Sequence, residues 1–519
     1  MKLFTIGDSI SQGVMSGAAA RSDLSYSAII ARLLYGKAFD SNYLMPEWPA
    51  GGIPFNIETL MRRLEHLAGA DISGPIEWPA AADCIIRYID EVEDYYERGA
   101  GGLHTALPRN AYHNVSVRGF DVAHSWLIHP AMAKAEIALS AGDHDGIFSL
   151  PAEANLRVAQ HVLGAGSPAE TDRFTQLDWL RHHHSQSGVE NLFLWLGANN
   201  ALGTVLDLQI RQTSNSGDRF TSGTIGYRER KAAGWNLWHP EDFRAEYRQL
   251  MERVTTIMDE NPKGVVWNVF IATIPLVTIC PIIKASGIEE REDVSVTEWP
   301  VDPENPAPLG SSELRDPVVR ECSYGRYYPH FLFADHFDKS LPHLNLAQVL
   351  HIDDTIRAYN RIILESVAEA NRLLGARRFW LVDIASCLSA LALRRNRYKP
   401  AYRLPDYFRY AYPRIDTRFF GSTRKGEMVS GGIFSLDGVH PTAIGQGIIA
   451  REFLQVMKRA GCFAGDPDTA IDWQAIAAAD TLYSRPPALM SEWFENIPMK
   501  KWIYRLTYSL ASGQSVKRP

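Results

Sequence analysis

The sequence predicts an α/β fold in which helices cover both faces of a parallel β-sheet. Five short apolar runs have the composition of buried strands, namely 2–6, 112–117, 191–196, 264–273 and 378–384. Patterns typical of amphipathic helices lie between or after these runs. Strands that alternate with helices favour a parallel sheet with helices on both sides, because the crossover helices pack back onto the sheet.

Each predicted helix depends on the spacing of apolar residues and on residues that can begin or end a helix. Residues 26–35 have helical spacing and stop before Gly36, and Asn56 can cap a helix that starts at Ile57. Pro441 suits the first turn of a last helix that runs to Val456. Three further amphipathic stretches are 81–98, 241–260 and 352–374.

Composition and charge place the chain among ordinary globular proteins. It has 519 residues, 46% hydrophobic, with a formal net charge of −7, so nothing global indicates a nucleic-acid partner. The five cysteines are scattered, odd in number and without CxxC spacing, which indicates reduced thiols. Residues 2–6 already have a strand pattern, and we expect neither a signal peptide nor a transmembrane segment. The expected compartment is the cytoplasm.

Long segments separate the predicted strands and exceed ordinary connections. We expect residues 1–462 to form one catalytic domain with insertions that are candidates for a cap, at about 36–105, 130–185, 204–235 and 285–345.

Residues 463–519 form a predicted helical, basic extension of that domain. Residues 496–519 contain five basic and no acidic side chains. Two interpretations stay open for this segment. It is either an interfacial helix that makes weak contact with a membrane surface or a helix packed on its own domain.

The first motif is Gly7-Asp8-Ser9, directly after the first predicted strand. A tight turn there would present the Ser9 hydroxyl, and the backbone N–H groups after the turn can face an oxyanion. Asp8 or Ser9 acting only as a helix cap explains the pattern about equally well when the motif is taken alone.

Two further segments follow the second and third predicted strands. Gly119 ends the run 114–119, and Asn199 lies in Gly197-Ala198-Asn199-Asn200. The carboxyl ends of parallel strands lie at one edge of the sheet, where ligands bind. We therefore expect Ser9, Gly119 and Asn199 to lie together. In isolation, a strand-ending glycine and a turn-forming asparagine pair are the simpler interpretations.

The fourth motif is Asp437-Gly438-Val439-His440, near the other end of the chain. A serine hydroxyl is a weak nucleophile that needs an imidazole to accept its proton and a carboxylate to orient that imidazole. Asp437 and His440 supply both groups at a spacing of three residues. A simple N-cap is the alternative explanation.

In this order, the four segments resemble the blocks of the GDSL esterases and lipases, also called SGNH hydrolases. The resemblance assigns the nucleophile to Ser9, the base to His440, its acidic partner to Asp437, and the oxyanion hole to Ser9, Gly119 and Asn199. It implies a three-layer α/β/α sandwich with a flavodoxin-like five-stranded parallel sheet. It also implies hydrolysis of carboxylic esters with no metal or other cofactor.

The chain departs from this family at two points. Asn200 stands where the third block commonly has Asp, and the chain is far longer than a minimal member. The substrate therefore stays open among small-molecule, lipid and glycan esters.

Two functions from other classes stay open. A metal-dependent phosphoesterase would use Asp8, Asn199, His440 and one of the other histidines as ligands. A catalytically silent protein would bind a glycan or lipid in the same cleft. The run His182–His184 does not have the spacing of a metal site, and we expect it in a solvated loop.

Overall fold

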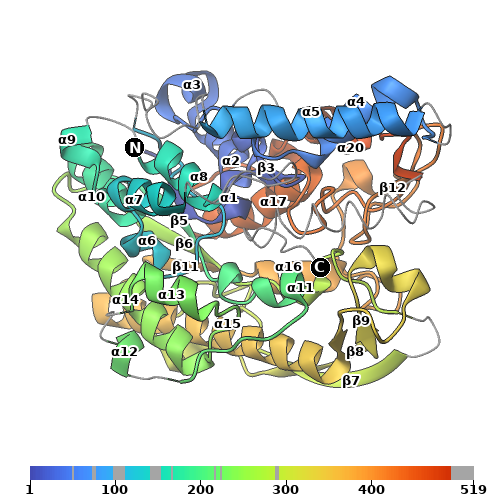
Figure 1. Ribbon diagram of the computed structural model, residues 1–519. Helices are drawn as coiled ribbons and strands as arrows, with labels where there is room; N and C mark the ends of the chain where they lie inside the picture. The colour runs from blue at the N-terminus through green and yellow to red at the C-terminus, as the bar shows by residue number, and fades with distance from the viewer. Residues whose placement is uncertain are drawn as a thin grey trace.

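The computed structural model describes residues 1–48, 52–72, 77–97, 111–140, 153–164, 168–215, 218–221, 225–286 and 291–491. Its centre is a sheet of four parallel strands in the order β1-β5-β6-β11 (Figure 1). Their bounds are β1 (Phe4–Gly7), β5 (Asn191–Trp195), β6 (Asn268–Ala272) and β11 (Phe379–Val382). Thr5 pairs with Phe193, and Phe193 pairs with Phe270. The predicted mixed α/β architecture with a parallel sheet is confirmed.

Helices pack on both faces of this sheet because successive strand residues point to opposite sides. Leu194 and Ile271 belong to one buried cluster, which includes residues of α10 (Gln176–Ser187), α14 (Pro240–Glu260) and α15 (Leu346–Leu374). Phe193 and Phe270 belong to a second cluster with α2 (Tyr26–Tyr35) and α17 (Ala443–Arg459). In Figure 1, α2 and α17 lie above the strands, and α14 and α15 lie below them.

Most predicted helices are present near their expected bounds. Residues 26–35 form α2, and Asn56 caps α4 (Ile57–Ala68) by accepting a hydrogen bond from the Thr59 N–H at 3.1 Å. The stretches 81–98, 241–260 and 352–374 correspond to α5 (Glu77–Glu97), α14 and α15. The other described helices are α1 (Ser9–Gln12), α3 (Phe39–Asn42), α6 (His124–Leu127), α7 (Pro130–Ser140), α8 (Ala154–Leu163), α9 (Pro168–Thr171), α11 (Gly203–Asp207), α12 (Asp218–Thr221), α13 (Tyr227–Ala233), α16 (Ile384–Leu391), α18 (Pro467–Ala470), α19 (Trp473–Ala479) and α20 (Thr481–Ser484).

Small antiparallel sheets surround the central one. Their strands are β2 (Val14–Met15), β3 (Ala18–Ala19), β4 (Ile53–Pro54), β7 (Arg291–Glu298), β8 (Val318–Gly325), β9 (Tyr327–Tyr328), β10 (Leu344–Asn345), β12 (Gly421–Ser422) and β13 (Met428–Ser430).

The predicted strand at 112–117 is not a regular strand. A single parallel bridge joins Asn114 to Thr5, and backbone hydrogen bonds from Val115 N to Thr5 O (3.0 Å) and Val117 N to Gly7 O (3.1 Å) hold the segment beside β1. The Gln176 side-chain amide donates to the carbonyl oxygens of Gly7 (2.9 Å) and Val115 (2.7 Å) between the two backbones. The segment therefore continues the sheet edge without completing a fifth strand.

Two other predictions were wrong. The last helix starts at Ala443, not Pro441, because Thr442 is the N-cap and accepts a hydrogen bond from Gly445 N. The histidine run lies in α10 and not in a solvated loop. His183 and His184 are buried and pair with the carbonyl oxygens of other segments, so burial of the apolar face of α10 decided their place.

The described part of the C-terminal extension packs on α17. Trp473 in α19 lies so close to Gly447 in α17 that a Cβ at that glycine would be 2.8 Å from the indole ring. The basic segment 496–519 lies outside the described residues. In the described part of the chain, no helix combines the length and apolar character needed to cross a membrane.

Candidate active site

Ser9 lies in a tight turn at the end of β1. Asp8 caps α1 by accepting a hydrogen bond from the Ile10 N–H at 3.0 Å, and Ser9 is the first helical residue. A Cβ at position 7 would lie 2.3 Å from the Ser11 Oγ, so the turn requires glycine there. Ser9 is buried, yet its side chain lines two cavities. Its hydroxyl has no hydrogen-bond partner among the described residues and is free to meet a ligand.

Asp437 and His440 form a tightly held pair. The His440 Nδ1 lies 2.7 Å from the Asp437 Oδ2, and the backbone N–H groups of Val439 and His440 both donate to the Asp437 Oδ1 at 2.8 Å. Burial alone would raise the pKa of Asp437, but the charge of His440 and these hydrogen bonds outweigh it and lower the pKa to about 2. Asp437 is therefore ionised at neutral pH and fixes the tautomer that leaves the His440 Nε2 as an acceptor.

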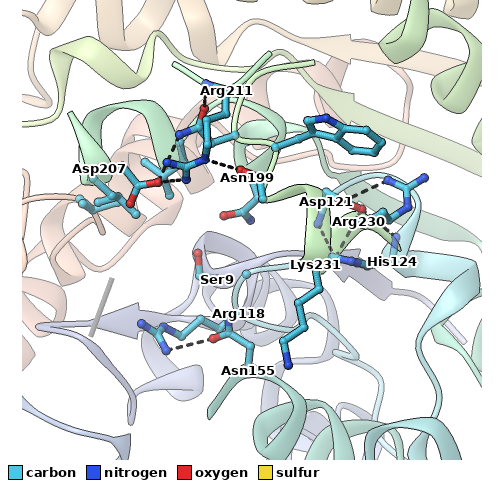
Figure 2. A pocket seen from close by; sticks show the side chains of 18 of the residues that line it. Ser9, Arg118, Asp121, His124, Asn155, Asn199, Asp207, Arg211, Arg230 and Lys231 are labelled. Atoms are coloured by element: carbon cyan, nitrogen blue, oxygen red, sulfur yellow. Dashed lines mark hydrogen bonds and ion pairs between the residues drawn. The ribbon is translucent and has the colours of Figure 1, made fainter. Parts of the chain in front are cut away.

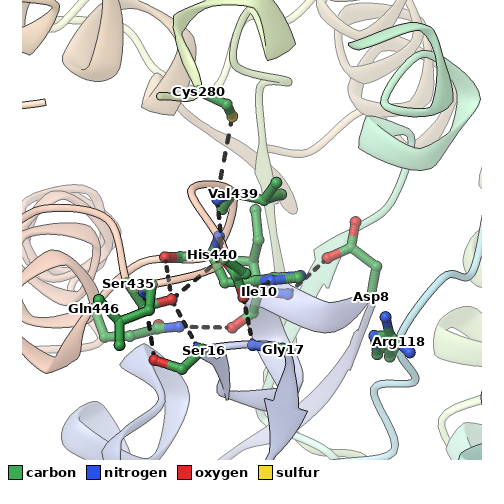
Figure 3. Close-up of polar contacts among 12 residues, drawn as sticks. Asp8, Ile10, Ser16, Gly17, Arg118, Cys280, Ser435, Val439, His440 and Gln446 are labelled. Carbon is green, nitrogen blue, oxygen red and sulfur yellow. Dashed lines mark hydrogen bonds and ion pairs between the residues drawn. The ribbon is translucent and has the colours of Figure 1, made fainter. Parts of the chain in front are cut away.

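The two ends of the chain meet at this pair (Figure 3). The Gly17 N–H donates to the Asp437 Oδ2 at 2.7 Å, and the Ser16 N–H donates to the Ser435 Oγ at 2.8 Å. The Gln446 side chain donates to the Ile10 carbonyl oxygen at 2.9 Å, one residue beyond Ser9. Ser9 and His440 line the same two cavities without a hydrogen bond between them. Nucleophile–base hydrogen bonds are often loose in the absence of substrate.

Gly119 brings a second backbone N–H to the site. Its φ of +77° lies in the left-handed region, and a Cβ there would be 2.3 Å from the Asn155 Nδ2. Both facts require glycine. Within the described residues, the N–H groups of Ser9 and Gly119 have no hydrogen-bond acceptor, and both residues line the larger cavity. Two predicted oxyanion donors are therefore available to a ligand.

Asn199, the third predicted donor, lies in the turn after β5, where Gly197 has a φ of +123°. It lines both cavities beside Ser9. Its side-chain amide donates to the Phe120 carbonyl oxygen at 2.9 Å and to the Asp8 Oδ2 at 3.3 Å. Asn199 would therefore exchange the longer bond, to Asp8, for a bond to a ligand.

Asp8 is the described carboxylic acid whose pKa is raised furthest from its ordinary value. Burial raises its pKa to about 7, although the Ile10 N–H and the charge of His440 oppose the shift. The carboxyl therefore changes charge near neutral pH, close to Asn199 and His440. The fold sets which residues lie near Asp8, and the motif could not predict them.

The larger cavity, of about 300 Å³, has a polar wall (Figure 2). Beyond the proposed catalytic residues it is lined by basic, acidic and amide side chains, including Arg118, Asn155, Arg230 and Lys231. Arg118 donates to the Asn155 Oδ1 at 3.0 Å. The His124 Nε2 is buried and has no hydrogen-bond partner among the described residues. This wall offers more donors than acceptors to a ligand.

The smaller cavity, of about 40 Å³, lies on another side of Ser9 and His440 and is mainly apolar. Leu202, Leu276, Val277, Ile279 and Phe434 line it. Cys280 also lines it, and burial raises the pKa of its thiol to about 12, so the thiol stays protonated at neutral pH.

Most residues of the polar wall were not predicted from the sequence motifs. Arg118 adjoins Gly119 and could have been proposed from that position alone. Asn155 and Lys231 lie in long segments with no motif, and no sequence signal connects them to Ser9. Asn155 reaches the site because α8 packs over Gly119.

No family model matches the chain, and no curated protein and no solved structure shows significant similarity to it.

Proposed function

We propose that this protein is a serine ester hydrolase of the GDSL type. One observation carries the proposal: Asp437 orients His440 beside the two cavities that also receive the unbonded hydroxyl of Ser9. Ser9 lies more than 400 residues before Asp437 and His440 in the sequence, and a hydrogen bond from the Gly17 N–H to the Asp437 Oδ2 joins the two segments. A helix cap would explain Asp8 or Asp437 separately but would not explain this convergence.

In the proposed reaction, the Ser9 Oγ attacks the acyl carbon while the His440 Nε2 takes the hydroxyl proton. The tetrahedral intermediate then collapses, the C–O bond to the alcohol breaks, and His440 returns the proton to the leaving oxygen. Water attacks the acyl-enzyme in the same way, with His440 again acting as base, and releases the acid and free Ser9. Asp437 stabilises the imidazolium in both steps.

The N–H groups of Ser9 and Gly119 would stabilise the oxyanion, with the Asn199 amide as third donor. Loss of one such donor typically raises the barrier by about 3 kcal/mol. Protonation of Asp8 would weaken its hold on the Asn199 amide, since a neutral carboxyl is a poorer acceptor than a carboxylate.

The two cavities support an assignment of the substrate's two halves. The apolar cavity suits a short acyl group, because about 40 Å³ leaves room for only a few carbon atoms. The polar cavity suits the alcohol, and its donors Arg118, His124 and Lys231 favour an alcohol rich in acceptor oxygens. The proposal is thus a short-chain ester of a polar alcohol.

The proposal includes the flavodoxin-like arrangement of the GDSL family, with residues 113–117 in the place of a fifth strand. Their backbone hydrogen bonds to β1 support it. The metal-dependent alternative has less support. Among the described residues, no three His, Cys, Asp or Glu side chains converge in a way that would hold a metal ion.

The test is labelling of the full chain with a fluorophosphonate probe, followed by mass spectrometry of the modified peptide. We expect an adduct on Ser9 that disappears in Ser9→Ala and His440→Ala. Ser11→Ala is the matched control, since the Ser11 hydroxyl bonds Tyr26 at 2.9 Å and does not line either cavity. Unchanged labelling in folded Ser9→Ala would overturn the mechanism.

A further inference from the structure

A third cavity, separate from Ser9, is lined by four arginines. It has a volume of about 40 Å³ and lies between the turn after β6, the start of β7 and the chain that follows α16. Its charged residues are Arg291, Arg394, Arg395 and Arg418, and none of the described residues that line it is acidic. The cavity beside Ser9 differs, since Asp121, Asp207 and Asp437 share its wall with the basic residues.

Two of these arginines are neutralised by acids outside the cavity. Arg395 pairs with the buried Asp353 at 3.4 Å, and Arg418 pairs with Asp416 at 2.7 Å. Arg395 also donates to the Thr278 Oγ1 at 2.9 Å, so its guanidinium is fixed at the cavity wall.

The other two arginines, Arg291 and Arg394, form no ion pair with a carboxylate within the described part of the chain. Arg291 donates to the Arg394 carbonyl oxygen at 3.1 Å, and its Nε is buried without a partner. The Arg394 guanidinium forms no hydrogen bond or ion pair with any described residue. Burial lowers the pKa of Arg394, and the charges of Arg291 and Arg418 lower it further. Asp335 opposes this effect from a distance and is itself paired with Lys284.

Partly buried like charges without counter-ions destabilise a fold, because each loses hydration and repels the others. A bound anion would offset both effects. Planar guanidinium groups match the oxygens of a phosphate group, to which they can donate two parallel hydrogen bonds. A volume of about 40 Å³ would hold about three waters, which is also the room that one phosphate group needs.

We propose that this arginine-lined cavity binds a single phosphate group, supplied either by inorganic phosphate or by the end of a phosphomonoester. Arg291 and Arg394 contribute charge that no carboxylate of the described residues pairs with, and Arg395 and Arg418 contribute fixed donors. The site is independent of the proposed esterase chemistry. Ile279 nevertheless lines both this cavity and the apolar cavity beside Ser9, so an anion here lies one side chain away from the proposed acyl site.

The experiment is isothermal titration of the full chain with inorganic phosphate at constant ionic strength, together with thermal unfolding. We expect saturable binding and a phosphate-dependent rise in Tm for the wild type. Arg394→Met should weaken binding at least 10-fold. Without phosphate, this variant should unfold at a higher temperature than the wild type, because the substitution removes repulsion. A merely structural Arg394 would give a lower Tm instead.

Arg409→Met is the matched control, since Arg409 is exposed and lies outside the cavity. It should bind phosphate like the wild type. If Arg394→Met does not fold, Arg291→Met carries the same expectation. Glycerol phosphate distinguishes the two sources: competition with phosphate indicates a cavity open to phosphomonoesters, and failure to compete indicates free phosphate. Absence of saturable binding by the wild type, or binding by Arg394→Met and Arg291→Met as tight as that of the wild type, would overturn the proposal.

Discussion

The two cavities that meet at Ser9 and His440 differ in both chemistry and origin. The apolar one is walled by residues next to the central sheet and the last motif, such as Val277 after β6 and Phe434 before Asp437. The polar one takes Asn155 from α8 and Lys231 from α13, which lie in the long segments between strands. The proposed catalytic residues lie where the two walls join.

This difference separates the roles of the core and the insertions. The core elements hold the proposed catalytic residues and the acyl wall, so a change there should alter the reaction itself or the acyl preference. The insertions supply part of the polar wall, including Asn155 and Lys231, so a change at those residues should alter the choice of alcohol alone. Each of the following experiments tests that division.

The largest effect is expected where the walls join. Ser9→Ala should lower kcat by on the order of 10⁶-fold on any ester, because no other serine or threonine of the described residues lines either cavity. Circular dichroism should show an unchanged fold, since the Ser9 hydroxyl bonds no described residue. Residual activity within about 10-fold of the wild type would place the chemistry elsewhere.

Asp437→Asn should lower kcat by on the order of 10⁴-fold while leaving KM nearly unchanged, because the His440 tautomer is no longer fixed. The pKa of Asp437 is lowered from 3.8 to about 2, so its ionised form stabilises the fold above pH 4. That contribution, on the order of 2 kcal/mol, is lost as the pH falls through 2. Urea unfolding of wild type and variant at pH 7 and pH 3 measures it. A variant as acid-sensitive as the wild type would contradict the assignment.

Asp8 is the acid of the apolar cavity, and its folded pKa is raised from 3.8 to about 7. Its neutral form therefore stabilises the fold fully below about pH 4, and the contribution is lost as the pH rises through 7. The loss is on the order of 4 kcal/mol at most. Asp8→Asn should remove this pH dependence, which unfolding at pH 5 and pH 8.5 would show. A parallel decline in both proteins would mean that Asp8 is ionised throughout.

Val277→Ala should enlarge the apolar cavity and shift the acyl preference. We expect the ratio of kcat/KM for hexanoyl over acetyl esters to rise about 10-fold, because one or two methylene groups gain space. Val205→Ala is the control, since Val205 is buried but lines neither cavity. An equal shift in both variants would indicate general loosening of the fold.

The smallest effect is expected in the polar wall. Lys231→Met should lower kcat/KM about 3-fold for an ester whose alcohol carries a carboxylate, and leave the ester of a neutral alcohol unchanged. Its charge is partly engaged with Glu153, which limits the effect. Lys263→Met, at an exposed position, should change neither. A changed acyl preference in Lys231→Met would contradict the division between the two walls.

Local patterns predicted the elements well because their determinants lie within a few residues. The apolar spacing of 26–35 and the side chain of Asn56 were enough to place α2 and the start of α4. The local patterns failed at two places. The Gln176 side-chain amide bonds the carbonyl oxygens of Gly7 and Val115, and 112–117 keeps only a bridge to β1. Thr442 caps α17, so this helix begins two residues after the expected start.

The candidate site was predicted only in part. Asp437 and His440 are three residues apart, so their contact follows from one turn of chain, and the motifs alone could suggest it. The hydrogen bonds of Asn199 to Asp8 and Phe120 were not predictable, because they depend on three segments that meet only in the fold.

By itself, the sequence determined the strand and helix positions and the residue types available for acyl transfer, since propensity, capping and turn geometry act over short distances. Only the tertiary structure decided that Gly17 bonds Asp437, that Asp8 is buried next to His440, and that four arginines share one cavity. Burial, and with it the loss of hydration that sets pKa and charge repulsion, is a property of neighbours in space and not in sequence.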